Sequence, residues 1–348
     1  MVFQSYDKLF APSKAYWAYW QELTEDAVYN GLIIEGWFAD KLPPIFTADK
    51  FLSYCNDRKT ASNASPSDWI RFNYIRCNGQ YREFGIPTPF TYERLARGIA
   101  NSWNDIVCHV KKYTLLQSYS VSRIHPRVIP DSQAIFQMNY SNWMNDPSPE
   151  PAILIGKQYV VKCDISTCFP SIYTHSLPWA IMGRDRAKQD RKVRPDNWAN
   201  KIDKLLQIVS DGETHGLLIG PHSSNVVSEL ILTVIDANLY NKGYRFIRNI
   251  DDYSCYVASQ QEGEGFILSL QEELSKFRLT LNQKKTEVLE LPMALSQSWV
   301  NSLRRNEPIK SDPLGYKDVS SFLEYAISLL PSCLLYTSDA ADDRISVD

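Results

Sequence analysis

The sequence lacks paired cysteine motifs, a secretory signal and any long apolar run. Its seven cysteines are scattered, odd in number and free of Cys-x-x-Cys spacing, so we expect neither a zinc site nor a disulfide framework. No apolar stretch approaches the roughly 18 residues that a membrane-spanning helix needs. These absences predict reduced thiols, a cytoplasmic protein and no membrane partner.

An excess of positive charge is also lacking. The chain has 37 Lys and Arg against 40 Asp and Glu, a formal net charge of -3. Such a chain has no overall attraction for nucleic acid, so any nucleic-acid binding must come from a local patch. The strongest candidate is RDRAKQDRKVR, residues 184–194, whose six basic and two acidic residues give a net +4. A solvated helix or loop face is an equally good interpretation of this stretch.

Aromatic residues and prolines mark the first 150 residues. Prolines interrupt the chain within residues 41–46, 84–90 and 123–130. Between the last two interruptions, residues 91–110 carry apolar side chains at helical spacing and predict one helix.

From residue 151 onward the sequence predicts regular strands and helices. An apolar run over residues 152–166 predicts β-structure that runs into an acid, Asp164. The remaining predicted elements are helices over 197–212, 223–240 and 266–277, a β-hairpin over 244–257, and two short strands around a turn over 279–291. Ser223 or Ser224 can cap the second of these helices. This order predicts an α+β fold, a sheet with helices on one face.

The hairpin segment, YRFIRNIDDYSCYV, puts Asp251 and Asp252 side by side in a run that favours burial. Burying a carboxylate costs several kcal/mol unless it is paired or bound to metal. Adjacent strands could bring both acids to Asp164, and three carboxylates at one point repel one another unless a cation lies among them. Mg²⁺ suits such oxygen ligands, and two ions about 3.5–4 Å apart serve phosphoryl transfer. The alternative is that some of these acids only cap a turn.

Four stretches, in their order and spacing, resemble the successive palm motifs of reverse transcriptases. They are CDISTCFPSIYTHSLPWAI (163–181), GLLIGPHSSNVVSELILTVID (216–236), RNIDDYSCYV (248–257) and LNQKKTEV (281–288). The stretches YNGLIIEGWFADKLPPIF and YREFGIPTPFTYERLARGIANSW look like the N-terminal part of bacterial members. The resemblance extends over residues 30 to 320, approximately. Within the family, the chain is most similar to the defence-associated enzymes of the abortive-infection and antiphage groups, which the basic insert supports.

This resemblance implies a right-hand polymerase with fingers and a palm, whose antiparallel palm sheet is backed by helices. Residues 1–150 would form the N-terminal fingers region. Residues 151–290 would form the palm, with a basic fingers segment inserted near 182–200. Residues 291–332 would begin a thumb or helical C-terminal region, most of the thumb being missing.

The last residues, 333–348, change composition abruptly and are expected to be unstructured. Within them, LLYTSDAADD resembles adapter read-through at the end of a metagenomic reading frame. The natural protein would then continue, and this chain would be truncated. A disordered acidic tail is the alternative.

The resemblance also implies a metal site. By position, Asp164 and Asp251 resemble the two metal ligands of the family, and Asp252 resembles their less directly coordinating neighbour. Ile165 would contribute its backbone carbonyl. The implied cofactor is Mg²⁺, two ions, with Mn²⁺ possible. The chain departs from many relatives at Asn249, where they carry an aromatic residue.

Substrate contacts follow from the same resemblance. Phe169 lies where the family places an aromatic ring that clashes with a 2′-hydroxyl and so selects deoxynucleotides, whereas the alternative is an ordinary core residue. Gly220 and Pro221 resemble the loop that packs against the incoming base and template, although Ile219 replaces the Gln of many relatives. Arg123 resembles a fingers residue that grips phosphates, because the Arg fork binds them bidentately.

One lysine of the LNQKKTEV stretch completes the implied site. Lys285 resembles the lysine that protonates the leaving pyrophosphate and offsets its charge. Its neighbour Lys284 is the rival, and a solvated turn lysine is the third interpretation.

The resemblance implies an RNA-directed DNA polymerase, active in antiphage defence. Its partners would be an RNA or DNA template-primer and deoxynucleoside triphosphates, and the sequence predicts no oligomeric state. Three alternatives stay open: a template-independent DNA polymerase, an RNA-dependent RNA polymerase, and a catalytically silent nucleic-acid scaffold. Phe169 argues against RNA synthesis, and the intact acids argue against a silent scaffold because unpaired buried acids only cost stability.

Overall fold

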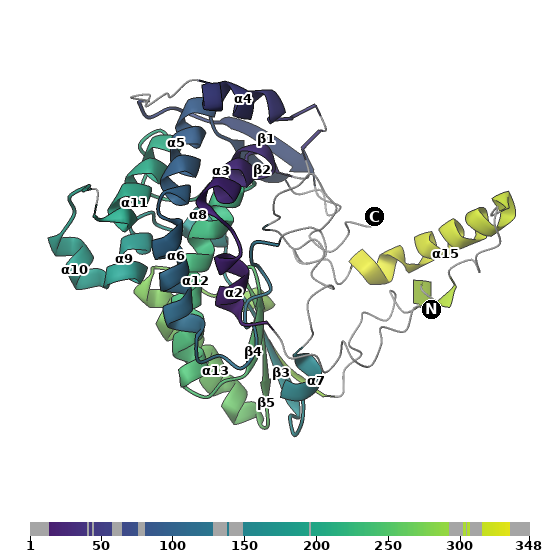
Figure 1. The fold of residues 1–348 in the computed structure, drawn as a ribbon. Coiled ribbons are helices and arrows are strands. Elements are labelled where there is room, and N and C mark those ends of the chain that lie inside the picture. Colours follow the sequence, from purple (N-terminus) through teal and green to yellow (C-terminus); the bar gives the residue numbers. More distant parts are fainter. Residues whose placement is uncertain are drawn as a thin grey trace. The chain divides into compact units, whose positions relative to one another are not determined.

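The computed structural model describes residues 14–39, 42–43, 45–57, 65–75, 81–127, 138, 149–194, 196–291, 302–303, 305–306 and 315–334. The chain divides into two compact units, residues 1–74 with 81–289 and residues 75–80 with 290–348. Figure 1 shows the elements of the first unit, which contains every candidate site residue named above.

A four-stranded sheet with the order β4-β5-β3-β6 organises the first unit. Its strands are β3 (Tyr159–Asp164), β4 (Phe246–Asn249), β5 (Asp252–Val257) and β6 (Glu287–Glu290). β4 and β5 form the predicted hairpin with Ile250 and Asp251 between them, and β5 runs antiparallel to both β4 and β3. The hairpin and its place in an antiparallel sheet are therefore confirmed.

Two helices, α12 (His222–Asn241) and α13 (Gln260–Lys276), lie on one face of this sheet (Figure 1). Burial alternates along β5 because successive side chains point to opposite faces. Its buried residues are Tyr253, Cys255 and Val257, and the residues between them are half-buried. The predicted α+β class, with helices on one face of the sheet, is confirmed.

The outer edge of β4 is paired with another segment of the chain. The Arg123 N–H donates to the Arg248 carbonyl at 2.8 Å, and the Arg248 N–H donates to the Val121 carbonyl at 2.9 Å. Ser122 and Arg248 thereby form a parallel bridge. This segment extends the hydrogen bonding of the sheet by one short, irregular strand.

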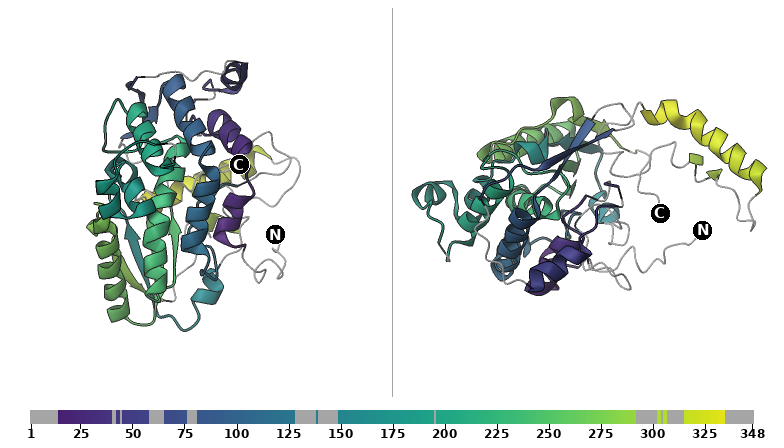
Figure 2. Two further views of the ribbon diagram at one scale, coloured as in Figure 1. Left: turned by 60° about the vertical axis from the view of Figure 1, so that its left-hand side comes forward. Right: turned by 90° about the horizontal axis from the view of Figure 1, so that it is seen from above.

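Further helices pack on α12 and on one another. They are α2 (Tyr16–Gln21), α3 (Glu25–Ile34), α5 (Pro89–Ala100), α6 (Trp103–Thr114), α9 (Ser176–Met182) and α11 (Trp198–Val209). Figure 2 shows α6 and α12 side by side. A two-stranded sheet of β1 (Ile70–Ile75) and β2 (Tyr81–Ile86) and the helix α4 (Asp49–Asp57) complete the part of the unit drawn at the top of Figure 1.

The single helix predicted over residues 91–110 is wrong, because α5 and α6 are separate helices. Asn101 ends the first helix and Ser102 precedes the second. The Ser102 hydroxyl donates to the Gly98 carbonyl at 2.9 Å, four residues back. Such back-bonding bends helices, and the apolar spacing on either side does not reveal it.

The strand predicted over residues 152–166 is also too long. Its first part is the short helix α7 (Glu150–Ile153), and the chain becomes extended only at Tyr159. Gly156, with φ +73°, lies in the turn between them. Left-handed glycines commonly end helices, and a short apolar run does not distinguish helix from strand.

The predicted helix ends hold for α11 and are corrected for α12. Asn197 caps α11, its side chain accepting from the Asn200 N–H, and the helix is followed by Gly212 at φ +85°. The predicted serine cap of α12 is wrong, because the helix begins at His222 with Pro221 at the N-cap position. Proline fixes φ near its helical value, which suits a helix start.

The second unit contains the helix α15 (Tyr316–Leu334). Its apolar side chains Val319, Leu323 and Ile327 are exposed. The tail predicted to be unstructured begins at residue 333, but residues 333 and 334 still belong to α15; its remainder, residues 335–348, lies outside the described residues.

The predictions about membrane spans and cysteines can be compared with the described residues. None of the described helices has the length and apolarity needed to cross a membrane. Five cysteines are described as free thiols: Cys55, Cys108, Cys163, Cys168 and Cys255.

A buried histidine joins α6 to α12. The His109 ring donates from Nε2 to the Leu230 carbonyl at 3.0 Å, and the side chain is 7% exposed. Burial lowers the pKa of His109 to about 4, because the charged imidazolium is poorly solvated there. The folded protein therefore holds this ring neutral at pH 7.

We expect stability to fall as the pH drops below the ordinary histidine pKa of about 6.5. In this pH range His109 binds a proton in the unfolded chain but not in the folded protein. The free energy of unfolding therefore falls by about 2 kcal/mol between pH 7 and pH 5. Urea unfolding of the wild type and His109→Gln at several pH values measures it. The variant keeps a donor but does not titrate, so its stability should fall less. Equal pH slopes would contradict the prediction.

Candidate active site

The acids predicted from sequence meet at one end of the sheet. In the register of β3 with β5, Asp164 is the partner of Asp252, and Asp252 in turn is the partner of Asn249 on β4. Partner residues on antiparallel strands lie about 4.5–5.5 Å apart at Cα. Asp251 follows in the turn, where its carbonyl accepts from the Ile165 N–H at 3.2 Å. Two segments far apart in sequence thus bring all three acids together.

Lys285 lies beside the first of these acids. Its Nζ is 3.4 Å from Asp164 Oδ2, and the Asn282 side chain donates to the same oxygen at 3.0 Å. The Asn282 N–H also donates to the Asp164 carbonyl at 2.8 Å, which fixes the segment against the end of β3. A 3₁₀ turn, η2 (Gln283–Lys285), then brings Lys285 over Asp164 and leaves Lys284 exposed. Of the two rival lysines, Lys285 is the one in contact with Asp164.

The turn between β4 and β5 is strained. Ile250 has φ +56°, and a β-branched residue in this left-handed region is a steric outlier. Such residues cost about 1–3 kcal/mol and persist only where the surroundings hold them. Here a hydrogen bond stabilises the strained turn: Arg248 Nη1 donates to the Ile250 carbonyl at 2.8 Å.

Arg248 is a buried charge beside these acids that sequence reasoning missed. Its side chain is fully buried and is ion-paired with two acids of α12, Glu229 and Asp236. Burial opposes the charged guanidinium, but the two carboxylates outweigh it and hold the pKa of Arg248 well above its usual range. Burial raises the pKa of Asp236, although Arg248 acts in the opposite direction. The signal was present: two acids seven residues apart share one face of an otherwise apolar helix.

Phe169 lies in α8 (Cys168–Ser171), a single helical turn directly after the end of β3. Its ring is partly buried and packs against the core, and its carbonyl accepts from the Leu217 N–H at 2.8 Å. This bond joins the segment after Asp164 to the loop that leads into α12. The role of Phe169 as a sugar gate stays a prediction.

The predicted Gly-Pro loop is held tightly. Gly220 has φ +121°, and a Cβ there would lie 3.1 Å from the Cβ of Ala39 and 3.3 Å from the Phe84 ring. The Gly85 N–H donates to the Ile219 carbonyl at 3.0 Å, which ties the loop to β2. Pro221 then starts α12. The sequence requires glycine here both for its backbone angle and for the close approach.

Arg123, predicted to grip phosphate, lies beside the edge strand β4 with its side chain buried. Its side chain is 3% exposed, and its Nη2 donates to Glu150 at 2.9 Å. Its main chain pairs with β4, as described above. Its contact with substrate phosphate stays a prediction, and in this structure the guanidinium is paired with Glu150.

The basic segment predicted near residues 182–200 contains α10 (Arg184–Gln189), which is followed by residues 190–194 without regular secondary structure. Arg184 lies over the Trp179 ring at 4.8 Å, while Arg194 pairs with Asp190 and with Asp196. Internal pairing therefore neutralises part of its charge.

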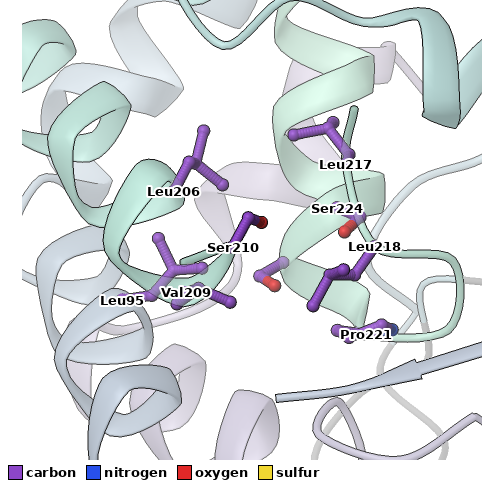
Figure 3. A pocket seen from close by; sticks show the side chains of 9 residues that line it. Leu95, Leu206, Val209, Ser210, Leu217, Leu218, Pro221 and Ser224 are labelled. Carbon is purple, nitrogen blue, oxygen red and sulfur yellow. The ribbon is translucent and has the colours of Figure 1, made fainter. Parts of the chain in front are cut away.

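A cavity between α11 and the start of α12 is too small for a substrate. Figure 3 shows Leu95, Leu206 and Val209 facing Leu217 and Ser224 across it. The cavity volume is about 10 Å³, so it holds one water molecule at most. It is therefore not a nucleotide pocket.

The donor chemistry at the strand ends fits Mg²⁺, although the side chains are not gathered into a cage. No group of three His, Cys, Asp or Glu side chains with metal-holding geometry occurs among the residues that the structure describes. Asp164 is instead turned to Asn282 and Lys285. The Asn249 carboxamide oxygen, in the same row, is buried without a hydrogen-bond partner. Hard oxygen donors and an unpartnered acceptor suit a Mg²⁺ site, which stays a prediction.

Comparisons with known proteins give only distant likenesses. No model of a known protein family matches the chain, and no curated protein matches it. Among solved structures it is similar to an apo telomerase from Candida tropicalis, with TM-score 0.40 and 12% identity, over 69% of this chain and 48% of that one. A form of that telomerase truncated from its C-terminal domain gives TM-score 0.40 and 11% identity, over 75% and 59%. The chain thus spans roughly half the length of these telomerase chains, and the fold assignment rests on the register described above.

Replacing Gly220 by Ala should destabilise the protein more than the same change at Gly243. Both glycines have positive φ, but a Cβ at Gly243 meets open space, so that variant pays only the backbone cost of about 1–2 kcal/mol. The difference in unfolding free energy between the two variants, from urea titration, isolates the close approach to Ala39 and Phe84. Equal losses would show that the loop has room to shift.

Proposed function

We propose that this protein is a nucleotidyltransferase of the reverse transcriptase type, an RNA-directed DNA polymerase that joins deoxynucleotides to a 3′-hydroxyl by two-metal phosphoryl transfer. The observation that carries the proposal is the register that sets Asp164 opposite Asp252, with Asp251 in the adjoining turn. Like charges that face each other across two strands destabilise a sheet, and a cation between them removes that cost. A polymerase site explains the arrangement, because it needs hard cations beside substrate phosphates.

The chain's own groups have distinct parts in this proposal. Asp164 and Asp251 would hold the metal ions, with Asp252 beside them and the Ile165 carbonyl as a further ligand. Mg²⁺, or Mn²⁺ in its place, supplies charge neutralisation for the triphosphate when bound. Lys285, 3.4 Å from Asp164, would offset the charge that develops on the leaving pyrophosphate.

Substrate selection would come from the segments that join β3 to α12. Phe169 follows Asp164 by five residues, and a ring beneath the sugar would restrict the site to deoxynucleotides. Gly220 and Pro221 would pack against the incoming base and the template. The hydrogen bond from Leu217 to the Phe169 carbonyl supports a common site, since it joins the two segments.

Nucleic acid would bind on the sheet face opposite α12 and α13. Lys162 is exposed and two residues from Asp164 on β3, so it shares that face with the acids. The basic segment 184–194 would contact the sugar-phosphate backbone of the nucleic acid at a greater distance from the acids. In polymerase terms, residues 1–150 would be fingers, 151–290 the palm and 291–332 the start of a thumb. An antiphage role in the cytoplasm belongs to the same proposal, through the resemblance to the defence-associated enzymes.

An assay of nucleotide incorporation, with and without template, would also detect two other functions. Incorporation that needs no template would favour a template-independent DNA polymerase. Nucleic-acid binding without any incorporation would favour a silent scaffold.

Asp251→Asn should reduce nucleotide incorporation by about 100-fold or more, because charge placement at the reacting phosphate is lost. The variant should fold and, without Mg²⁺, melt at the wild-type temperature or above, since a like charge is removed. Mg²⁺ should raise the melting temperature of the wild type more than that of the variant.

The matched control for this experiment is Asp105→Asn, on the exposed side of α6. It makes the same chemical change away from the sheet and should leave both incorporation and the Mg²⁺ response at wild-type levels. Full activity in Asp251→Asn would refute the proposed role.

Phe169→Ala should raise the ratio of ribonucleotide to deoxyribonucleotide incorporation, by about tenfold or more, because the ring no longer meets the 2′-hydroxyl. Single-nucleotide primer extension with each substrate measures the ratio. Phe51→Ala removes another half-buried ring, on α4, and controls for lost packing. An unchanged ratio in Phe169→Ala would identify Phe169 as a core residue.

A further inference from the structure

Arg248 uses all five of its N–H donors. Four of them reach carboxylate oxygens: Nε and one of Nη2 donate to Asp236, and one each of Nη1 and Nη2 donates to Glu229, at 2.7–2.9 Å. The remaining N–H of Nη1 donates to the Ile250 carbonyl at 2.8 Å. The guanidinium therefore has one bond left over from its ion pairs, and that bond goes to the strained turn.

The two carboxylates are themselves fixed, so the guanidinium has one orientation. The Tyr253 hydroxyl donates to Asp236 Oδ1 at 3.0 Å, and the Tyr16 hydroxyl shares its one proton between Glu229 Oε2, at 2.7 Å, and the Ile124 carbonyl, at 2.6 Å. Both acids come from α12, whereas the tyrosines come from β5 and α2. A planar fork held from two sides can direct its last N–H at only one place.

The turn needs such a partner. Ile250 lies in the left-handed region, which isoleucine avoids, and the next residue is Asp251. The Asp251 carbonyl makes the bond to the Ile165 N–H that links the turn to the end of β3. If the Ile250 carbonyl were released, the turn could relax toward ordinary backbone angles, and this link would weaken.

We propose that Arg248 is a positioning residue that holds the Ile250 turn in its strained conformation and thereby sets the places of Asp251 and Asp252 beside Asp164. The proposal rests on the proposed function for its catalytic consequence. Its structural part stands on the contacts alone, and the two parts are tested by separate measurements.

Arg248→Lys is the first variant. Lysine keeps the positive charge between Glu229 and Asp236, but its three donors on one nitrogen cannot serve both acids and also reach the Ile250 carbonyl. Arg245→Lys is the matched control, because Arg245 lies just before β4 and donates only to carbonyls of Tyr240 and Tyr244 among its described hydrogen bonds.

Amide hydrogen exchange at single-residue resolution tests the structural part without any substrate. In Arg248→Lys the Ile165 N–H, which donates to Asp251, should exchange about tenfold faster or more, as expected for local opening. The Asn282 N–H donates to the Asp164 carbonyl on the other side of β3 and should exchange at the wild-type rate. In Arg245→Lys both amides should be unchanged.

Steady-state kinetics tests the catalytic part. Arg248→Lys should lower kcat for deoxynucleotide incorporation by about 10- to 100-fold with KM changed by less than about threefold, because misplaced reacting groups lower the rate rather than the binding. Ile250→Gly, added to Arg248→Lys, should restore part of both kcat and Ile165 protection. Glycine adopts the left-handed conformation without strain and no longer needs the bond.

The outcomes separate the two proposals. Wild-type protein without nucleotide incorporation would overturn the proposed function and leave the exchange result to decide the role of Arg248. Folded Arg248→Lys with normal Ile165 exchange would overturn the positioning role, as would a loss that Ile250→Gly does not restore. If Arg248→Lys does not fold, Glu229→Gln takes its place, since it loosens the fork and lowers the buried negative charge. Normal Ile165 exchange in that variant would equally overturn the role.

Discussion

A buried guanidinium between two carboxylates is the interaction on which the sheet end depends. Arg248 on β4 joins Glu229 and Asp236 on α12, so one charged cluster fastens the central helix to the hairpin. Removing one partner from a buried cluster of this kind costs about 3–5 kcal/mol, because the remaining charges stay in a poorly solvated place. The cluster carries one positive and two negative groups. Burial raises the pKa of Asp236, Arg248 acts in the opposite direction, and the negative charge of Glu229 raises it further. Helix and hairpin are thereby fixed in one relative position.

The acids outside this cluster follow a different rule. Asp164 and Asp252 oppose each other at the open face, where their repulsion is met on one side by Lys285 and Asn282. Inside the sheet, one guanidinium faces two carboxylates; at the strand ends, Asp164 lies opposite Asp252, with Lys285 beside Asp164. The acidic groups that could take part in chemistry therefore lie at the end of β3 and at the hairpin turn.

Sequence reasoning located this end of the sheet because Asp164 ends one apolar run, Asp251 and Asp252 lie within the run of a predicted hairpin, and strand ends are set by local pattern. It assigned Lys285 by resemblance and kept Lys284 as a rival, since the contact with Asp164 depends on a 3₁₀ turn that Asn282 fixes by bonding to β3. It also missed the partners of Arg248, because burial of an acid on a helix does not reveal what faces it. Sequence reasoning did not predict the break between α5 and α6, because the break coincides with a local hydrogen bond from the Ser102 hydroxyl to the Gly98 carbonyl. Pattern therefore predicted the elements, and individual polar contacts decided how they end and meet.

The pairing of residues 121–123 with β4 has a consequence for how this protein behaves in a crowded solution. An open strand edge offers a row of free backbone groups to which a strand of another chain can add. Here the N–H of Arg248 is already bonded to the Val121 carbonyl, and the Arg248 carbonyl to the Arg123 N–H. The hairpin that carries the acids is thus closed to edge-to-edge aggregation at that position. A substitution that loosened this short segment would expose a template for self-association, even if every acid stayed in place.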